Sequence, residues 1–264
     1  MFLPTGEQMN IKIIVATHKS YFIPEDSMYL PVQAGAAINA QLPYAGDNTG
    51  VNISAKNKNF CELTVLYWAW KNLDADYLGL VHYRRHFAGK NSGDKKSRII
   101  TEKQLSAMLE KVPLIMPRKR NYFIESNESQ YIHAHHAEDL DVTYAVIAEK
   151  YPEYLFAYKK VMKSTKGYRF NMCIMRKDLL NDYCTWLFDI LFEVEKRLDI
   201  SQYSAYDARV FGFISERLLD IWVEKNQPAL KTLPLVNLES QQWGKKIRNF
   251  LLRKISGGKW GKTR

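Results

Sequence analysis

Short apolar runs alternate with longer amphipathic stretches along most of the chain. The first run, IKIIVA at 11–16, is rich in β-branched residues and predicts a strand. Similar runs predict further strands at 77–83, 112–117 and 168–177. Strands separated by helices are typical of an α/β domain whose sheet is covered on both faces.

The stretches between these strands repeat apolar residues at three- and four-residue spacing, which is the pattern of amphipathic helices. Helices are predicted at 60–73, 101–111, 137–151, 152–163, 178–198 and 206–226. Thr101 and Gln104 fit a capping box at the start of the second of these helices. Residues 24–59 are rich in Pro, Gly, Asn and Asp and predict a long loop region. Within it, VQAGAAINA at 32–40 predicts a short strand or helix. The polar stretch before 137 predicts a flexible connection.

The basic excess of the chain is concentrated at its C-terminal end. Eight of the 38 Lys and Arg residues lie in 243–264, which contains no acidic residue. The remainder carries 30 basic against 28 acidic residues, so the protein carries a basic tail without being basic throughout. We therefore divide the chain into leader residues at 1–8, a domain at 9–240 and a tail at 241–264.

The tail also has an apolar face, because Trp243, Ile247, Phe250, Leu251 and Ile255 share one side of a helix. A basic amphipathic helix with aromatic anchors is typical of segments that lie on anionic membranes. The alternative is a helix docked on its own domain with a solvated basic face.

Cysteine usage and hydropathy indicate the compartment. Cys61, Cys173 and Cys184 form no CxxC pair and are odd in number, which favours a reducing environment. The sequence contains no signal peptide pattern and no apolar run of the roughly 18 residues that a membrane span needs. We expect a cytoplasmic protein that is peripheral on the inner face of the cytoplasmic membrane.

Two of the predicted strands end in polar clusters. The first strand ends at Thr17, His18 and Lys19, and GLVHYRRHF places His82, Tyr83, Arg84 and Arg85 at the end of the second. Ligands of open α/β sheets bind outside the carboxyl ends of strands, so we expect both clusters to face one crevice. Guanidinium groups match phosphate oxygens, which makes a diphosphate the expected ligand. The alternative is that the two arginines pair with acidic residues at the rim of the core.

Asp74-Ala75-Asp76 resembles the Asp-x-Asp metal motif of nucleotide-sugar enzymes. That motif usually follows a strand, whereas here it precedes one, at a turn where Asp is favoured for its own hydrogen bonding. We favour the turn, and expect arginines to neutralise the diphosphate with no required metal. Mn or Mg held by Asp74 and Asp76 is the alternative.

Two further segments contain candidate acids and bases. YIHAHHAEDL holds three histidines, but no second Cys or His cluster completes a zinc site. One of these histidines, together with Asp139, either acts in catalysis or sugar binding, or forms the polar start of a helix. Asp207, close to Arg209, either caps the last helix or faces the crevice as a base.

Six segments, taken in order, resemble one family. They are IKIIVATHK, NISAKNKNFCELTVLYWAWKN, YLGLVHYRRHF, QYIHAHHAEDL, NMCIMRKDLLNDYCTWLFDIL and YDARVFGFISERLLDIWVEKN. Together they span about 11–227 and are similar to the capsular polysaccharide synthesis glycosyltransferases gathered as DUF4422. The resemblance implies a single GT-A-like α/β domain, with a mixed central sheet flanked by helices, that uses a UDP-sugar. Some members look like galactofuranosyltransferases of bacterial surface polysaccharides such as capsule and O-antigen.

The resemblance also assigns residues. Thr17, His18, Lys19, Asn52, Ser54, Lys56 and Asn57, together with the His82–Arg85 tip, are expected to bind the donor. His135, Asn171 and Arg209 are expected to bind acceptor or sugar. We expect Asp207 as the catalytic base, with Asp139 second and Glu62 third, and a lipid-linked oligosaccharide as the acceptor.

A rival interpretation is a non-catalytic subunit that binds a nucleotide or glycan and scaffolds a polysaccharide assembly complex. The sequence lacks a P-loop, a GxGxxG loop and a GxSxG elbow. It also lacks a nucleic-acid recognition signature outside the basic tail, so no nucleic-acid partner is expected.

Overall fold

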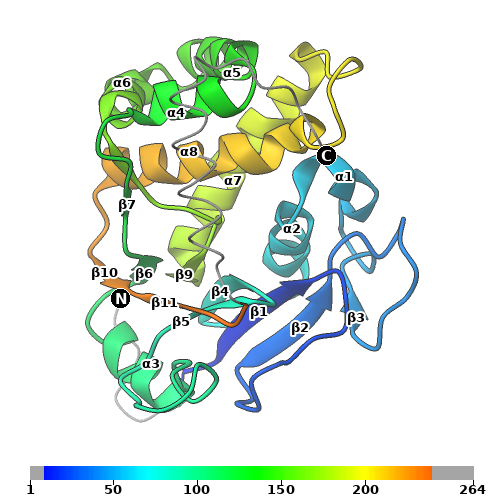
Figure 1. Cartoon of the computed structure of the whole chain (residues 1–264), viewed down its shortest axis with the longest axis vertical. Coiled ribbons are helices and arrows are strands. Elements are labelled where there is room, and N and C mark those ends of the chain that lie inside the picture. The colour runs from blue at the N-terminus through cyan, green and yellow to red at the C-terminus, as the bar shows by residue number, and fades with distance from the viewer. Residues whose placement is uncertain (1–8, 240–264) are drawn as a thin grey trace, which may run out of the picture.

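The computed structural model describes residues 9–239, so the leader at 1–8 and the tail from 240 onward lie outside the described residues. A mixed sheet in the order β10-β6-β9-β4-β1-β2-β3 forms its centre, and helices flank it (Figure 1). The expected α/β architecture with a mixed, helix-flanked sheet is therefore confirmed.

The strand bounds follow the apolar runs closely where these runs are strongest. The main strands are β1 (Ile11–Thr17), β2 (Tyr29–Gln33), β3 (Ala45–Gly46), β4 (Tyr77–His82), β6 (Leu114–Pro117), β9 (Cys173–Arg176) and β10 (Leu230–Leu233). Short strands β5 (Arg85–Phe87) and β11 (Leu235–Asn237) extend the sheet beyond β4. A separate ladder joins β7 (Arg120–Asn121) to β8 (Lys166–Gly167).

Strand direction decides which polar ends meet. β1 and β4 are parallel, with Ala16 opposite His82, so their carboxyl ends lie at one edge of the sheet. β9 runs antiparallel between β4 and β6, which makes the sheet mixed. Alternate residues of β1 belong to different cores: Ile14 and Ala16 pack on one face, Ile13 and Val15 on the other. Burial on both faces explains why the strand is a continuous apolar run.

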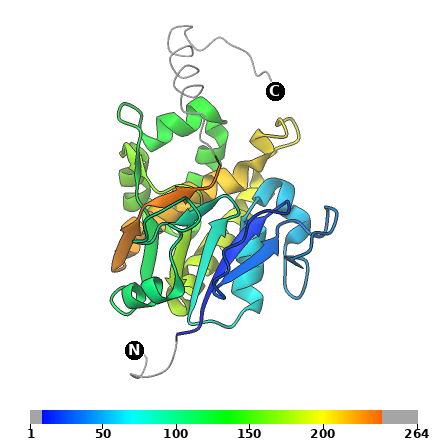
Figure 2. The ribbon, with the colours of Figure 1, turned by 60° about the horizontal axis from the view of Figure 1, so that its bottom comes forward.

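Helices cover both faces of the sheet unequally (Figures 1 and 2). The larger core includes α2 (Leu63–Asn72), α7 (Lys177–Arg197) and α8 (Val210–Asn226), while α3 (Glu102–Leu109) packs on the smaller one. Beyond α7 and α8 lie α4 (Asn127–Ala134), α5 (Ala137–Lys150) and α6 (Leu155–Lys163). Short helical segments complete the set: η1 (Ser54–Lys56), α1 (Asn57–Phe60), η2 (Pro152–Tyr154) and η3 (Asp207–Arg209).

Several local predictions are wrong. Residues 29–33, in the predicted loop region, form β2 beside β1, and the polar stretch before 137 contains α4, capped by Ser126. The predicted capping box is absent: Thr101 makes no side-chain cap, and Asp26 Oδ2 accepts from the Glu102 N–H instead. The N-terminus of α3 is therefore capped by Asp26, which is distant in the sequence, instead of by the neighbouring Thr101.

Two elements are shorter than predicted because the backbone turns left-handed inside them. The helix predicted at 60–73 is broken at Cys61, whose φ is 52°, into α1 and α2. The strand predicted at 168–177 shrinks to β9, because Phe170 and Asn171 have φ values of 74° and 53°. Both interruptions lie beside the candidate site.

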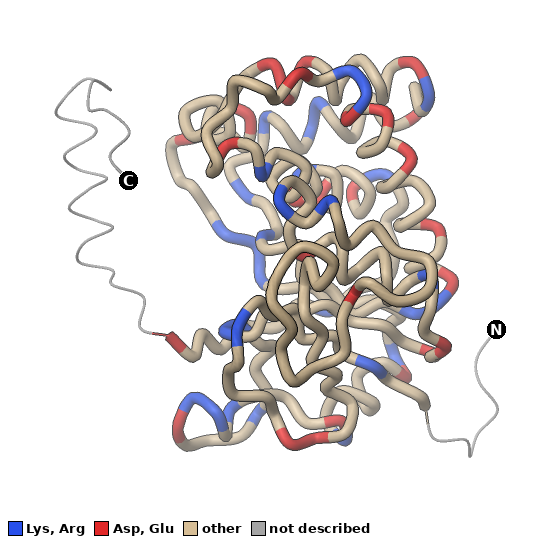
Figure 3. The backbone as a smooth tube through the Cα atoms, turned by 90° about the vertical axis from the view of Figure 1, so that its right-hand side faces the viewer, with Lys and Arg blue, Asp and Glu red and all other residues tan. Residues whose placement is uncertain are grey.

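Basic and acidic residues are interspersed over the described part of the chain (Figure 3). This distribution fits the near balance of charge outside the tail. Within residues 9–239, each helix is too short or too polar to cross a membrane.

Candidate functional site

The polar ends of β1 and β4 meet around the ring of Tyr83. This ring is buried and makes edge contacts with His18 and Tyr21, at centroid distances of 5.0 and 5.1 Å. Lys19 Nζ lies 5.0 Å and the Arg84 guanidinium carbon 5.6 Å from its centroid. The structure therefore brings together the two clusters that the strand pattern predicted to share an edge.

Glu239 lies between the two cations of this edge. Its carboxylate is 3.0 Å from Arg84 Nη1 and 3.5 Å from Lys19 Nζ, and hydrogen bonds from Arg84 are the main cause of its lowered pKa. The pKa of His18 is lowered by burial, then by the charges of Lys19, Arg84 and Arg209. The edge is therefore electropositive, and Glu239 partly neutralises it.

Arg85 lies deeper than Arg84 and faces an aromatic ring. Its guanidinium carbon lies 4.2 Å from the Phe170 centroid, while its buried Nε has no hydrogen-bond partner in the described part of the chain. Burial and then Arg84 lower the pKa of Arg85, and the charges of Glu216 and Glu62 oppose this effect. An arginine keeps its charge under such a shift, so Arg85 is a permanent, partly desolvated cation.

Glu62 occupies the centre of the site and is held by Asn171. Asn171 Nδ2 donates to Glu62 Oε1 at 2.8 Å and to the Gly212 carbonyl at 3.1 Å, while Ser215 Oγ donates to Asn171 Oδ1 at 2.9 Å. The charge of Glu62 acts on both Arg85 and Arg209. A half-buried carboxylate thus lies among cations, in a fixed orientation.

The backbone around Glu62 is strained. Cys61, Phe170 and Asn171 all have positive φ angles, and such sparsely populated conformations cost of order 1–3 kcal/mol each. Polar contacts hold Phe170 and Asn171 in this conformation. The Phe170 N–H donates to Glu216 at 2.9 Å, and the Phe170 carbonyl lies 2.7 Å from His82 Nε2. Strain of this kind concentrates at functional sites, where surrounding contacts maintain it.

Close packing of α8 adds to this arrangement. A Cβ on Gly212 would lie 3.2 Å from Cys61 Sγ, so a glycine lets α8 approach the junction of α1 and α2. Arg209 Nε donates to the same sulfur at 3.2 Å. Burial raises the pKa of the Cys61 thiol to about 11, so the thiol is protonated at neutral pH.

The two aspartates expected as bases are buried beside this centre. Asp139 accepts hydrogen bonds from the Tyr131 and Tyr203 hydroxyls at 2.8 and 2.7 Å, and burial raises its pKa. Asp207 accepts from Ser204 Oγ at 2.6 Å and lies 3.8 Å from a ring nitrogen of His135. Through these contacts, both carboxylates connect the 203–207 segment to helices α4 and α5 and the residues between them.

His135 belongs to an aromatic wall rather than to a metal site. Its ring stacks on Phe213 at 4.1 Å and lies 5.8 Å from the exposed ring of Tyr206. Burial lowers the pKa of His135 to about 4, so the ring is neutral at pH 7. The Arg209 guanidinium carbon lies 5.4 Å from the centroid of Phe213 and 5.9 Å from that of Tyr206. Arg209 therefore connects the aromatic wall to Cys61 and Glu62.

The two neighbouring histidines make contacts of their own. His133 Nδ1 lies 2.8 Å from Glu125, and His136 stacks on Tyr203 at 4.1 Å. His136 Nε2 also lies 3.8 Å from Asp207 Oδ2, so His135 and His136 both face Asp207, whereas His133 pairs elsewhere. Within residues 9–239 no group of three or more His, Cys, Asp or Glu side chains is arranged to hold a metal ion.

The side chains of the 52–57 loop are engaged within the protein. Ser54 is fully buried and bonds to Asp47, and Asn52 Oδ1 accepts from the Ser54 N–H at 3.1 Å. Lys56 pairs with Glu195 at 2.6 Å, and Asn57 donates to the Cys61 carbonyl at 2.7 Å. This loop shapes the chain just before Glu62.

Asp74 and Asp76 lie at the opposite edge of the sheet. Asp74 pairs with Lys177 at 2.6 Å, and Asp76 accepts from the Asn10 N–H at 2.8 Å. The length of β4, roughly 20 Å, separates them from Tyr83. The turn interpretation of this motif agrees with both contacts.

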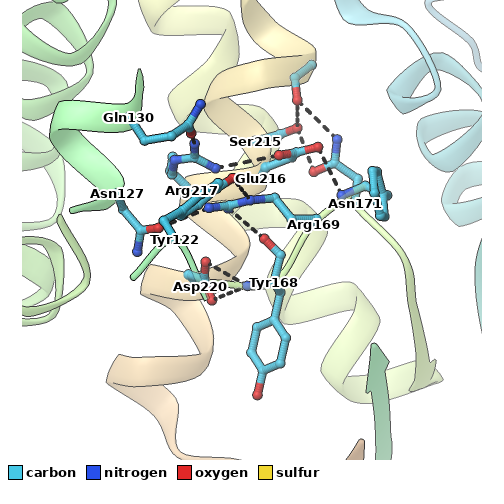
Figure 4. A network of polar contacts seen from close by, with 12 residues as sticks. Tyr122, Asn127, Gln130, Tyr168, Arg169, Asn171, Ser215, Glu216, Arg217 and Asp220 are labelled. Carbon is cyan, nitrogen blue, oxygen red and sulfur yellow. Dashed lines mark hydrogen bonds and ion pairs between the residues drawn. The ribbon is translucent and has the colours of Figure 1, made fainter. Parts of the chain in front are cut away.

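A buried polar network next to the site has no counterpart in the sequence predictions (Figure 4). It contains Arg169, Arg217 and Asp220, which are all almost completely buried. Glu216 connects the network to the site, because it binds the Phe170 N–H and lies 3.5 Å from Arg217 Nη1. The spacing of Glu216, Arg217 and Asp220 on one helix was the signal available in the sequence.

Comparisons with known proteins match most of the chain. The family model described as domain of unknown function DUF4422 matches residues 12–227. A solved apo structure of WbbM, a bifunctional glycosyltransferase, is similar over 88% of this chain with 32% identity and a TM-score of 0.81. The match covers 46% of the WbbM chain, so this chain spans about half the length of that protein. A search of curated proteins found no match.

Proposed function

The chain belongs to the DUF4422 family, and on that premise we propose that it is a glycosyltransferase that moves a sugar from a UDP-sugar to a glycan acceptor. The observation that carries the proposal is the group of cations at the carboxyl edge of β1 and β4, next to the half-buried carboxylate of Glu62. The similarity to a bifunctional glycosyltransferase over most of the chain supports the same reaction class.

The donor diphosphate binds at Lys19, Arg84 and Arg85 in this proposal. Arg84 is accessible, and the partly exposed carboxylate of Glu239 is exchangeable for phosphate oxygens. The three cations stabilise the negative charge that develops on UDP as the glycosidic bond breaks. In this proposal the three cations stabilise the diphosphate without a required metal ion. UDP binding that depends on Mn or Mg would contradict the proposal.

A cavity of about 310 Å³ beside these cations supports a site for the nucleoside. Tyr21, Phe22 and Leu238 contribute apolar walls, and Asp94, Lys95 and Lys96 contribute charge of both signs. Lys95 Nζ donates to the carbonyls of Leu238 and Glu239, both at 3.4 Å, so the cavity adjoins the Glu239 ion pairs. Aromatic faces of this kind stack on a nucleobase.

Glu62 is the base that the geometry favours for an inverting transfer. It shares its surroundings with Arg85 and Arg209, whereas Asp139 is fully engaged by two phenols and Asp207 is buried against Ser204. A carboxylate that removes the acceptor proton contributes about 10²–10⁴-fold. Glu62→Gln therefore lowers sugar transfer by that factor while UDP affinity is kept. Unchanged transfer would return Asp207 to first place.

The acceptor lies along the wall formed by Tyr206, His135 and Phe213, with Arg209 at its inner end. Flat aromatic faces pack on sugar rings, and the wall leads to Glu62. We propose galactofuranose as the transferred sugar and a lipid-linked oligosaccharide as the acceptor, in the synthesis of bacterial capsule or O-antigen. The basic tail then holds the protein on the inner face of the cytoplasmic membrane.

The test is a calorimetric titration of UDP in EDTA and then in manganese. Arg84→Ala lowers UDP affinity about 10- to 100-fold in EDTA, because charge-assisted bonds contribute about 1.5–3 kcal/mol each. The matched control is Arg176→Ala at the opposite edge. Its side chain is 37% exposed against 39% for Arg84, and it also pairs with one carboxylate, so affinity stays unchanged.

Binding only with manganese would contradict the arginine-held diphosphate. Binding of UDP without UDP release from any UDP-sugar plus acceptor would instead favour the non-catalytic scaffold.

A further inference from the structure

The segment 118–124 between β6 and α4 exposes two large apolar side chains side by side. Phe123 is 81% exposed and Ile124 is 65% exposed. Single exposed apolar residues are common on soluble proteins, but an adjacent pair of this size indicates contact with an apolar partner. Figure 1 shows the segment along one side of the molecule, leading from β6 through β7 to α4.

The backbone of this segment is built to present the pair. Phe123 has a left-handed φ of 62°, which is rare for a bulky residue. The Asn121 side chain accepts from the Phe123 N–H at 2.9 Å, and the Tyr122 carbonyl accepts from the Ile124 N–H at 2.8 Å. The β7–β8 ladder anchors the base of the turn. Strain held by several hydrogen bonds, at a position with no core contact to make, points to a function outside the fold.

Exposed cations surround the apolar tip. Arg118, Lys119 and Arg120 precede it, and Lys166 lies opposite Asn121 in the ladder. Lys119 and Arg120 lie over tyrosine rings at 4.7 and 5.2 Å, and none of these four cations has an ion pair with a carboxylate within residues 9–239. Acidic residues are nearby, but Glu125 already pairs with His133. Cations around an apolar tip are complementary to an anionic lipid surface.

The segment is also connected directly to the candidate site. The Tyr122 hydroxyl accepts from Arg169 Nε (Figure 4), and the Tyr122 N–H donates to the Thr165 carbonyl at 2.8 Å. Arg169 immediately precedes the strained pair Phe170 and Asn171. A partner that binds Phe123 and Ile124 is therefore held at a fixed distance from the candidate functional site.

We propose that segment 118–124 is a membrane-docking loop of the folded domain, in which Phe123 and Ile124 enter the headgroup region of an anionic bilayer. The four cations then lie level with the lipid phosphates. This contact is separate from the basic tail, and it does not depend on the donor or the sugar. It orients the domain toward a membrane-bound acceptor if the proposed function holds.

The experiment measures partition of the full chain onto vesicles of phosphatidylcholine, with or without phosphatidylglycerol. Phe123→Ser/Ile124→Ser is expected to weaken partition about 10-fold or more. The matched control is Phe156→Ser on α6, which removes an equally exposed ring (79%) elsewhere and leaves partition unchanged. Arg118→Gln/Lys119→Gln/Arg120→Gln is expected to lose about five-fold per cation, only on the anionic vesicles.

Because the proposed function also places the basic tail on the membrane, a probe attached to the loop is needed to report on the loop alone. A polarity-sensitive fluorophore on Ile124→Cys is expected to shift to the blue on anionic vesicles, and the same probe on Phe156→Cys is not. The native cysteines are buried or half-buried, which directs labelling to the new thiol. Unchanged emission at position 124, or a loop variant that partitions normally, would overturn the proposal and leave a protein partner as the occupant. UDP affinity of the loop variant reports separately on the donor site.

Discussion

The arginine pair Arg84 and Arg85 and the buried Arg169 lie within the same region of the fold and differ in how their charges are satisfied. Arg84 and Arg85 stand at the carboxyl edge of the sheet, where Arg84 has an exposed carboxylate partner and Arg85 has a buried Nε without one. Arg169 is 6% exposed and donates to three neutral acceptors: the Tyr122 hydroxyl, the Tyr168 carbonyl and Asn127 Oδ1 at 3.0 Å.

The difference separates a binding cation from a structural one. A buried arginine with a neutral acceptor on each of its three nitrogens is held along its whole fork and orders the segments around it. An arginine held by an exposed carboxylate, or left with an unused donor, can exchange partners at little cost. The same residue type therefore has different roles in neighbouring parts of the fold.

The largest expected effect is on stability. Arg169→Ala leaves three acceptors without a donor, and each buried group left unsatisfied costs about 1–3 kcal/mol, so the free energy of unfolding falls by about 4 kcal/mol. Arg84→Ala removes one exposed ion pair and lowers the free energy of unfolding by less than about 1 kcal/mol. Urea unfolding of both variants measures the contrast.

Arg169→Lys tests the same point if the alanine variant does not fold. It keeps the charge but loses the planar fork, so an intermediate loss is expected. Equal stability of the Arg84 and Arg169 variants would remove the distinction between the two groups.

An intermediate effect is expected from Asp220, the carboxyl of the buried network. It accepts the Tyr168 N–H, and burial raises its pKa to about 6. The folded state therefore binds the proton more tightly than the unfolded state does. The free energy of unfolding falls as pH rises from about 4 to about 6, by up to about 3 kcal/mol at 1.36 kcal/mol per pKa unit.

Asp220→Asn removes this dependence, because an amide does not titrate. The measurement is the difference in unfolding free energy between the two proteins across pH 4 to 7. A constant difference would mean that the nearby arginines hold Asp220 ionised, and the network would then resemble the ion pairs of the site.

The smallest expected effect is on ligand affinity. Glu239→Gln removes the carboxylate that lies between Arg84 and Lys19, so UDP no longer competes with it. UDP affinity rises roughly two- to five-fold, and the gain shrinks in high salt because the pair is exposed. Calorimetry at two salt concentrations measures it. Weaker UDP binding in this variant would mean that Glu239 itself contacts the nucleotide.

The sequence predicted the elements whose signal is local. The apolar runs at 11–16 and 77–83 became β1 and β4 with nearly the expected ends, and their parallel pairing brought the two polar clusters to one edge. It missed β2 because Pro31 and the surrounding turn residues hide a strand that pairing with β1 creates. The strand predicted through 168–172 failed because the conformations of Phe170 and Asn171 depend on Glu216, His82 and Glu62.

Those partners are 46, 88 and 109 residues away along the chain, so no window of neighbouring residues contains their influence. For the same reason, Glu62 ranked last among the candidate bases in the sequence, yet it lies with the arginines in the fold.

Sequence alone was enough to predict the alternation of strands and helices, the basic strand end at 82–85 and the basic tail, because apolar periodicity and residue type are local properties. The tertiary structure alone decided which polar groups share an environment. It placed Glu62 beside Asn171, Glu239 on Arg84, Arg169 among neutral acceptors and Phe123 in solvent. Burial and hydrogen-bond partners depend on contacts between distant segments, and those contacts exist only once the sheet and its helices have packed.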